Sequence, residues 1–369
     1  MRRRSFIGAG VGALSLGALA GCTGNGSDDG GNGNDGNGND RNGPDDDEDP
    51  TSTDGNGIHD GVYVQRFTDG MAMQGSAEAG DLMVAVMYSA PHRFWRMIGG
   101  ERKEEPREDS DSLHLMATVW DPETGTVVPE TGLSVEIAPE GGAFDEQVIY
   151  PMLSQPMGFH YGANFTLDGD GEYAVRVTVG GLNIRRTGAF EGRFGDPASA
   201  TVDIVFDEAT RQSVSEDVRE LDRYGDPGAL RPMDMMMPDG TLPAAESMPG
   251  ELVGTERTDD AVLPLLAVRD DPPVDAGTYL AVSARTPYNG YTLPAAGLEA
   301  TVERGGEAVF EGSLRRTLDP DLNYHYGAAL DSLEAGDEVT VRPVTPPQVS
   351  RHRGYERAFL EMDSVSYTV

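Results

Sequence analysis

The sequence predicts an all-β protein with two tandem β-sandwiches of immunoglobulin or cupredoxin-like shape, placed after a signal peptide and a disordered linker. Three observations predict this organisation. The chain matches itself at a constant spacing of 165 residues, short strand-like runs alternate with turn residues, and an export leader ends at Cys22, the only cysteine. A single cysteine excludes a disulfide framework and a cysteine-ligated zinc or iron–sulfur site.

Residues 1–22 have the features of an export signal. Three arginines precede a short apolar run that is too short to span a bilayer. The arginines followed by Ser5 and Phe6 resemble a twin-arginine signal, and Leu19-Ala20-Gly21-Cys22 resembles a lipobox. We therefore expect an exported lipoprotein at the cell surface, attached through Cys22 to the outer face of the cytoplasmic membrane. A leader cleaved near Ala20, with Cys22 incidental, is the alternative.

The composition is strongly acidic. The chain has 63 acidic and 28 basic residues, a formal net charge of −35, and Lys103 as its only lysine. This charge argues against nucleic acid as a partner. It favours a halophilic archaeon, in which salt screens the repulsion between carboxylates; an acidic surface protein of a mesophile is the alternative.

Residues 23–57 are almost entirely Gly, Asn, Asp, Ser, Pro and Thr, a composition that cannot form a core and predicts a flexible acidic linker. We place the first sandwich at 58–207, a connector at 208–260 and the second sandwich at 261–369. Within the connector, the spacing of Val214, Val218 and Leu221 predicts a short helix over 208–223, before a methionine-rich loop at 233–237.

The internal repeat links the two predicted sandwiches. Twelve of the residues that recur at the spacing of 165, seven of them Gly or Pro, indicate duplicated backbone geometry. The pairs are Leu115/Leu280, Pro122/Pro287, Gly125/Gly290, Pro129/Pro294, Gly132/Gly297, Leu133/Leu298, Gly141/Gly306, His160/His325, Tyr161/Tyr326, Gly162/Gly327, Ala163/Ala328 and Gly171/Gly336.

Three runs in the first copy have the length and partial alternation of β-strands: 81–88, 113–120 and 173–179. The segments 121–125 and 168–171 contain the Asp, Gly and Pro typical of turns. Short strands at this spacing are typical of a β-sandwich.

The candidate chemistry lies in the first copy, in the strand that carries His114 and in the segment from Pro151 to Asn164. Here the sequence resembles the periplasmic iron-transport lipoproteins that accompany ferrous permeases, over about residues 70–190. The resemblance implies a dimeric cupredoxin-like sandwich that binds iron or copper and assists its uptake or delivery to a permease. It places metal ligands at His114, Met152 and His160.

The sequence also departs from that family. Where the family has a glutamate two residues after its first histidine, this chain has Met116, and where it has a later His-x-His segment, the chain has Arg185 and Arg186. Thioether sulfur shifts metal preference towards Cu(I), so His114, Met116, Met152 and His160 would form an S2N2 set. A degenerate site is the alternative, and Arg186 near a metal would repel it unless it held an anion or a carboxylate.

The second copy retains fewer candidate ligands. His114 becomes Tyr279 and Met152 becomes Thr317; His325 remains, with His352 as a candidate for the late histidine of this copy. We expect this copy to be structural or to bind a partner. A histidine in a turn such as His-Tyr-Gly-Ala can also be purely structural, by tying down backbone groups.

Several further residues are weaker candidates. For His92 we expect a packing or surface role. The remaining methionines, Met71, Met73 and 233–237, resemble methionine-rich copper segments, although methionine also fills gaps in cores. The Asn164-Phe165-Thr166 sequon permits glycosylation, and the turn 168–171 lacks most ligands of a calcium loop.

The sequence has no phosphate-binding loop, no nucleophile elbow and no reactive cysteine. We therefore expect a non-enzymatic, surface-anchored metal-binding or metal-delivery protein, with a metal permease and a second copy of the chain as possible partners. The alternative is a structural or interaction lipoprotein without a working metal site.

Overall fold

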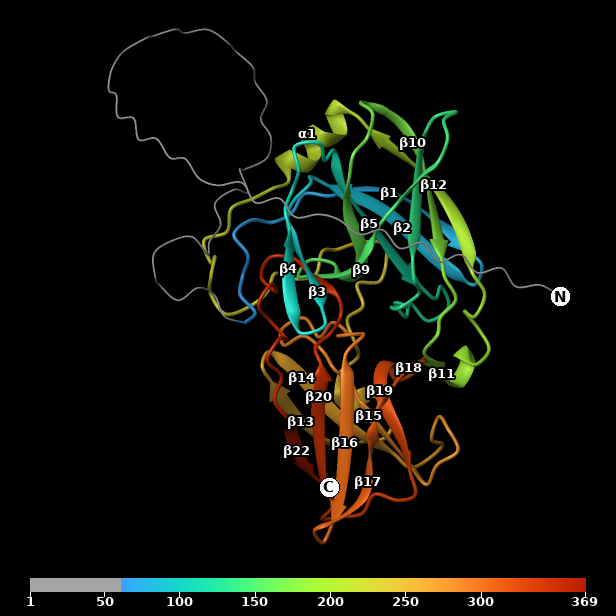
Figure 1. The fold of residues 1–369 in the computed structure, drawn as a ribbon, viewed down its shortest axis with the longest axis vertical. Coiled ribbons are helices and arrows are strands. Elements are labelled where there is room, and N and C mark those ends of the chain that lie inside the picture. The colour runs from blue at the N-terminus through green and yellow to red at the C-terminus, as the bar shows by residue number, and fades with distance from the viewer. Residues whose placement is uncertain (1–60) are drawn as a thin grey trace, which may run out of the picture. The chain divides into compact units, whose positions relative to one another are not determined.

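The computed structural model describes residues 61–369. The predicted signal, Cys22 and the linker at 23–57 lie outside the described residues. Strands dominate the described part, and their grouping into facing sheets confirms the all-β prediction (Figure 1).

The first sandwich combines a sheet of eight strands with a sheet of four. The large sheet has the order β1-β2-β5-β9-β8-β21-β3-β4, with bounds β1 Ala72–Ala79, β2 Leu82–Ser89, β3 Phe94–Ile98, β4 Glu101–Glu105, β5 Leu113–Trp120, β8 Tyr150–Ser154, β9 Gly158–Phe165 and β21 Ser350–Arg351. The small sheet has the order β12-β10-β6-β7, with bounds β6 Ser134–Pro139, β7 Asp145–Gln147, β10 Gly171–Val179 and β12 Ala198–Phe206.

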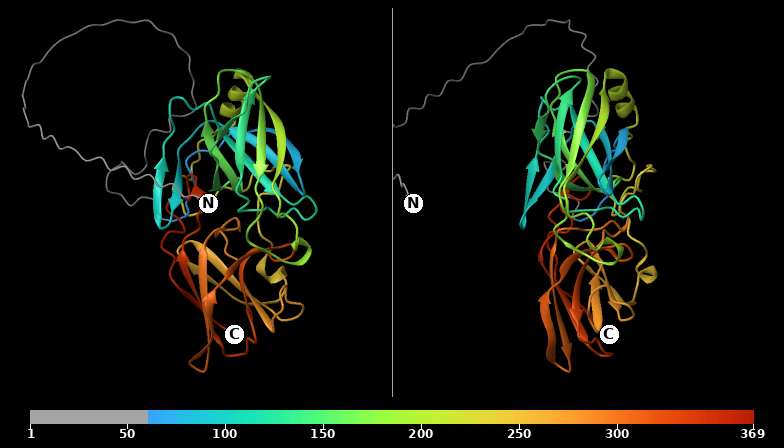
Figure 2. Two further views of the ribbon diagram at one scale, coloured as in Figure 1. Left: turned by 45° about the vertical axis from the view of Figure 1, so that its right-hand side comes forward. Right: turned by 90° about the vertical axis from the view of Figure 1, so that its right-hand side faces the viewer.

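The second sandwich repeats this arrangement with sheets of six and four strands. The first has the order β11-β18-β19-β15-β14-β13, with bounds β11 Arg185–Arg186, β13 Glu251–Thr258, β14 Ala261–Val268, β15 Thr278–Val282, β18 Arg315–Asp319 and β19 Asn323–Leu330. The other has the order β17-β16-β20-β22, with bounds β16 Gly297–Arg304, β17 Glu307–Ser313, β20 Glu338–Thr345 and β22 Val365–Thr368. Both views in Figure 2 show the orange to red strands of these two sheets as a group apart from the blue to green strands of the first sandwich.

The three predicted strand runs agree closely with the structure. The run 113–120 coincides with β5, 81–88 differs from β2 by one residue at each end, and 173–179 lies within β10. In β5 the residues alternate between two environments: Leu113, Leu115 and Ala117 join the core between the sheets, whereas His114 and Met116 lie on the other face. This alternation is what a strand with two covered faces requires.

Two predictions for the connector are wrong. The helix α1 spans Glu208–Glu216 and ends seven residues before the predicted limit, because the chain after Asp217 is extended and pairs with the N-terminal segment, as in the bridge between Phe67 and Glu220. Asp207 caps its start by accepting a hydrogen bond from the Thr210 N–H. The second sandwich also begins earlier than residue 261, because β13 pairs with β14 along its length. Only one face of β13 is covered, so its sequence lacks a strong apolar signal.

The segment from Pro151 to Asn164 is mostly strand. β8 and β9 form an antiparallel hairpin around the turn at residues 155–157, with Met152 opposite His160. The His-Tyr-Gly-Ala block is therefore part of a buried strand and does not form a turn as the sequence analysis expected.

The two sandwiches exchange short strands reciprocally. β21, from the second sandwich, pairs in parallel with β8 of the first, where Arg351 is opposite Leu153. β11, from the first sandwich, pairs in parallel with β18 of the second, where Arg186 is opposite Leu318. The two pairs correspond to each other at the spacing of 165: Arg186 corresponds to Arg351, and Leu153 corresponds to Leu318. The exchange therefore follows the internal repeat.

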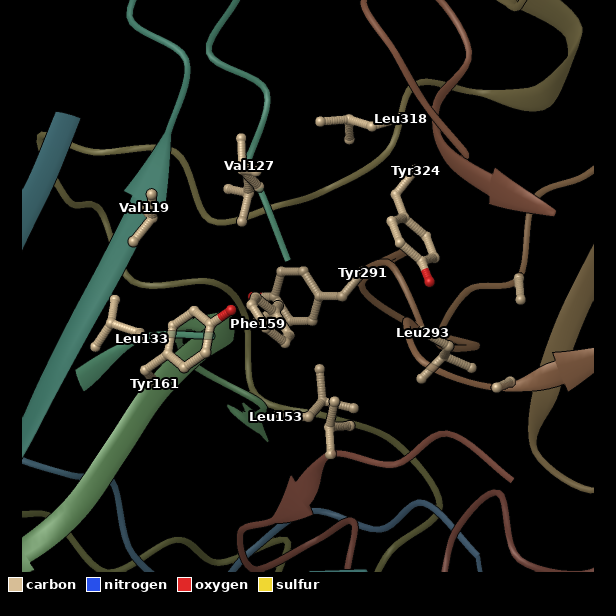
Figure 3. Close-up of a cluster of buried hydrophobic side chains, with 14 of the residues drawn as sticks. Val119, Val127, Leu133, Leu153, Phe159, Tyr161, Tyr291, Leu293, Leu318 and Tyr324 are labelled. Carbon is tan, nitrogen blue, oxygen red and sulfur yellow. The ribbon is translucent and has the colours of Figure 1, made fainter. Parts of the chain in front are cut away.

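One hydrophobic core continues across both sandwiches. Figure 3 shows side chains of the first sandwich, such as Leu153 and Phe159, in one cluster with Tyr291 and Tyr324 of the second. The Tyr291 hydroxyl donates a hydrogen bond to the carbonyl oxygen of Gln155, 2.9 Å away, in the turn between β8 and β9. The β8–β9 hairpin is thus held by contacts with both sandwiches.

Gly158 provides a test of this packing. Its φ is +67°, and a β-carbon there would lie 2.0 Å from the Asp239 carbonyl oxygen and 2.8 Å from the Tyr291 ring. We expect Gly158→Ala to cost more than about 3 kcal/mol of unfolding free energy in urea titrations. Gly132→Ala is the control, because its φ is +62° with nothing within 4 Å, so only backbone strain of about 1 kcal/mol applies. Equal costs for both variants would contradict this account of the interface.

Candidate metal centre

Three predicted ligands meet on the outer face of the large sheet, above Gly162. Cross-strand pairing places His114 opposite Asn164 and Met152 opposite His160. Gly162 lies between these pairs, and a β-carbon added there would be 2.8 Å from His114 Nε2 and 2.9 Å from Met152 Sδ. The absent side chain leaves the space in which the nitrogen and the sulfur approach each other.

The second sandwich contributes a fourth residue, His352, directly after β21. Its backbone N–H donates to the Leu153 carbonyl oxygen at 3.1 Å, which continues the strand exchange. Its Nε2 lies 3.2 Å from Met152 Sδ, and its ring centroid is 5.1 Å from that of His160. The sequence predicts His352 as a candidate ligand of the second copy. This was wrong, because the exchanged strand carries it to the first.

His92 is the fifth member of the cluster. Its Nε2 lies 3.1 Å from His352 Nδ1, and its ring centroid lies 4.1 Å from that of His114. One ring nitrogen from each of these three histidines lies within 4.8 Å of the others. His92, for which the sequence predicts a packing or surface role, thus lies among the candidate ligands. β2 ends at Ser89, opposite His114, so the chain delivers His92 to the site just after this strand.

The hydrogen bonds on the outer side of the cluster fix which ring nitrogen holds the proton. His114 Nδ1 donates to Asn164 Oδ1 at 2.8 Å, His160 Nδ1 to the Gly158 carbonyl oxygen at 3.1 Å, and His92 Nδ1 to the Ala90 carbonyl oxygen at 3.0 Å. Each of these neutral rings then presents an unprotonated Nε2. Such outer hydrogen bonds orient histidines that bind metals.

The inward-facing nitrogens lack partners. His114 Nε2 and His160 Nε2 are fully buried and make no hydrogen bond. A neutral His352 has one ring proton but two contacts, to the unprotonated His92 Nε2 and to Met152 Sδ. In one of these two contacts, a lone pair of His352 therefore faces a lone pair of its neighbour. Buried polar atoms without partners are costly, and a cation among these atoms would satisfy them.

Burial also favours the neutral form of three of these histidines, His114, His160 and His352. Removal from water lowers the pKa of His160 to about 4 and holds the pKa values of His114 and His352 well below their ordinary value, and the neighbouring histidines lower them further. Neutral imidazole is the form that binds metals. At neutral pH the rings therefore offer lone pairs without first releasing protons.

The donor set fits a transition metal. Two ligands about 2.1 Å from one ion are at most about 4.2 Å apart, so histidine nitrogens within 4.8 Å need only a small contraction. Within residues 61–369 this is the one group of at least three histidine, cysteine or carboxylate side chains with such spacing, and all three members are histidines. Met116 lies two residues from His114 on the same face, but it packs with Met87, Met157 and Met237. Its role as a ligand stays a prediction.

The equivalent position in the second sandwich is filled by the protein itself. His325 Nδ1 donates to the Asn323 carbonyl oxygen, and its Nε2 accepts a hydrogen bond from the Tyr279 hydroxyl, 2.9 Å away. Tyr279 replaces His114, and its hydroxyl occupies the space above Gly327, where a β-carbon would be 2.1 Å away. His325 therefore has no free lone pair.

Arg185 completes this second cluster. β11 brings it from the first sandwich, and its guanidinium donates to the Tyr279 hydroxyl at 2.8 Å, to Thr317 Oγ1 at 2.9 Å and to the Gly327 carbonyl oxygen at 3.0 Å. Arg186 donates to the Leu182 carbonyl oxygen. The expectation that these arginines lie near the first site was wrong, because the strand exchange carries them to the opposite copy.

Two residues of the weaker candidate sites, Asn164 of the sequon and Asp170 of the turn 168–171, make local side-chain contacts. Asn164 binds His114 through its oxygen, and its amide nitrogen donates to the His92 carbonyl oxygen at 2.9 Å. Its amide therefore positions the histidines, which argues against glycosylation. Asp170, in the turn 168–171, forms an ion pair with Arg211 at 2.6 Å.

No helix in residues 61–369 has the length and apolar character needed to cross a membrane.

Comparisons with known proteins give limited similarities. A family model described as a domain of unknown function, DUF7350, matches residues 246–368, about a third of the chain. No curated protein matches. A copper-bound variant of FetP from uropathogenic Escherichia coli is 19% identical and covers 37% of this chain and 97% of its own, with a TM-score of 0.28. FetP as isolated is also 19% identical and covers 37% and 95%, with a TM-score of 0.29.

The buried histidines predict a dependence of stability on pH. Burial lowers the pKa of His325 from 6.5 to about 4 in the folded protein, so the unfolded chain binds a proton between these values and the folded chain does not. Stability is therefore complete above pH 6.5 and is lost as the pH falls towards 4. Between pH 7 and pH 5 we expect metal-free wild type to lose up to about 2 kcal/mol more unfolding free energy than His325→Gln in urea titrations. Parallel losses in the two proteins would contradict this assignment.

Proposed function

We propose that the chain is a non-enzymatic copper-binding lipoprotein whose first sandwich holds the ion. The observation that supports this most is the contrast between the two copies. His160 Nε2 and His114 Nε2 are buried without partners, whereas the equivalent His325 Nε2 is bonded to Tyr279. The fold therefore does not require an unpaired nitrogen at this position, and the first copy keeps two of them next to Met152.

Copper fits the donor atoms better than iron. Imidazole nitrogen suits both metals, but a thioether favours Cu(I), and iron sites commonly include anionic oxygen. The three-histidine group has no carboxylate member, and Met116 replaces the glutamate that the family resemblance implies. His92, His114, His160, His352 and Met152 are the residues we propose to hold copper, with iron as the second choice.

The location of the protein supports a role in metal delivery. A lipid at Cys22, a linker of 35 residues and a buried site would let the folded part carry an ion to a permease in the same membrane. His352 comes from the same chain, so completing this site does not need a second copy. The predicted homodimer and the permease stay expectations.

A structural or interaction role without metal binding is the competing function, and one observation favours it. His160 and His325 make the same bond from Nδ1 to a backbone carbonyl oxygen, to Gly158 and Asn323 respectively. If this bond were the whole function of both histidines, alanine at either position would cost the same stability and change nothing else.

Metal titration distinguishes the two functions. We expect purified wild type to bind about one Cu(II) ion per chain, and His160→Ala and His352→Ala each to lower the Cu(II) affinity at least about 100-fold in calorimetry. His325→Ala is the matched control. It should leave copper affinity unchanged while costing about 1 kcal/mol more stability than His160→Ala, because it also removes the bond to Tyr279.

Two results would reject the copper proposal. One is wild type that binds neither Cu(I) nor Cu(II). The other is equal behaviour of His160→Ala and His325→Ala in both affinity and stability. Tighter binding of Fe(II) than of either copper ion would keep the site but change its cargo.

The anchor has a separate test. In cells that express the full chain, Cys22→Ser should move the protein from the membrane fraction to the soluble exported fraction, because lipid attachment at this residue is lost. Copper affinity of the released protein should match that of the mature wild type. Retention of the variant in the membrane would disprove the lipobox.

A further inference from the structure

Methionines gather beside the histidine cluster in a separate hydrophobic cluster, which we call the methionine cluster. Four of its five buried members are methionines, Met87, Met116, Met157 and Met237, and the fifth is Ala85. Met71, Met235 and Trp120 are partly buried against it. These methionines come from β2, β5, the turn after β8, the connector and the residue before β1, so tertiary structure alone brings them together.

Ordinary core packing does not account for this concentration. The main core of both sandwiches is built from Val, Leu, Ile, Ala, Phe and Tyr, and none of its fully buried members is a methionine. Methionine is a flexible gap filler that can occur in any core. Its exclusion from the large core and its abundance in the small one indicate a local requirement for sulfur.

The second sandwich provides an internal control. Its equivalent cluster has six buried members, of which one is a methionine, Met248, and three are Leu266, Ala281 and Leu322. The repeat spacing relates Ala281 to Met116 and Leu322 to Met157, and the pairing of Leu266 with Ala281 matches that of Met87 with Met116. Leucine and alanine therefore suffice at these positions of the fold, and methionine replaces them only in the copy with unpaired histidine nitrogens.

The methionine cluster adjoins the histidine cluster directly. Met116 is opposite Gly162 across β5 and β9, and the space above Gly162 contains His114 Nε2 and Met152 Sδ. At its other end the cluster reaches the connector, where Met235 is partly buried and the side chain of Met236 is fully exposed. The connector is held there by a hydrogen bond of 2.8 Å from the Met233 N–H to the Pro156 carbonyl oxygen.

We propose that the methionine cluster is a second binding site, for a soft monovalent cation such as Cu(I), between the surface and the histidine site. This inference rests on the proposed function, because it gives the same ion a second site. Thioethers are neutral and soft, so they bind Cu(I) and Ag(I) but hold Cu(II), Zn(II) and Fe(II) poorly. The cluster would therefore select the reduced ion before it reaches the buried histidines.

Ag(I) is the probe for this site, since it resembles Cu(I) but does not oxidise. In chloride-free buffer, we expect wild type labelled with 13C at the methionine methyl groups to bind about two Ag(I) ions per chain. The methyl signals of Met87, Met157 and Met237 should shift. Those of Met248 and Met362, which lie outside the cluster, should not.

The double variant Met87→Leu/Met157→Leu has leucine at both positions, as the second copy has at Leu266 and Leu322. We expect it to bind about one Ag(I) per chain and to keep its Cu(II) affinity within about threefold of wild type, because the histidines are unchanged. Met248→Leu, in the equivalent cluster of the second copy, is the matched control and should keep both ions. The methyl shifts in wild type test the inference even if the double variant is unstable.

The outcomes separate this inference from the copper proposal. Unshifted cluster methyls, or an unchanged Ag(I) count in a folded double variant, would mean that the methionines only pack, whether or not the histidines bind Cu(II). Cluster methyl shifts without Cu(II) binding would retain the thioether site and reject the histidine site. Loss of Ag(I) from Met248→Leu would show that the signal does not come from this cluster and would overturn the inference.

Discussion

The reciprocal exchange of two short strands is the constraint on which the rest of the structure depends. β21 and β11 are each two residues long, yet each adds to a sheet of the opposite sandwich. The bond from the His352 N–H to the Leu153 carbonyl oxygen has its counterpart in the bond from the Thr187 N–H to the Leu318 carbonyl oxygen, both at 3.1 Å. Few hydrogen bonds are involved, but the hydrophobic core continues across the same boundary and holds the exchanged strands in register.

The exchange gives the two copies the same framework but different contents. In the first copy, His352 follows the exchanged strand. It lies beside the Met152 thioether and the two histidines, His114 and His160, whose Nε2 atoms are unpaired. At the second, Thr187 takes the place of that histidine and bonds to Asp319, while Arg185 supplies a permanent positive charge among Tyr279, Thr317 and the Gly327 carbonyl oxygen. The guanidinium donates to all three oxygens, so these acceptors are satisfied without an ion. We propose that the first copy binds a cation from solution, whereas the second has a cation of its own in Arg185.

Much of the fold was predictable because strands and turns depend on nearby residues. The runs that became β2, β5 and β10 alternate in polarity, and the repeat of Gly and Pro reports backbone geometry directly. The errors lie where long-range pairing decides. β13 has little alternation and becomes a strand through β14, and α1 ends early because the chain after it pairs with residues near Phe67. Local propensity cannot detect either partner.

The sequence by itself predicted the all-β class and the duplication, and its resemblance to the iron-transport lipoproteins pointed to His114, Met152 and His160 in one copy. Residue type, spacing and that resemblance suffice for these inferences. Only the tertiary structure decided that His92 and His352 join these residues, that Arg185 fills the other copy, and that scattered methionines form one cluster. Each depends on which strand pairs with which across more than a hundred residues or between copies. Strand register, which no local pattern specifies between distant segments, sets those neighbours.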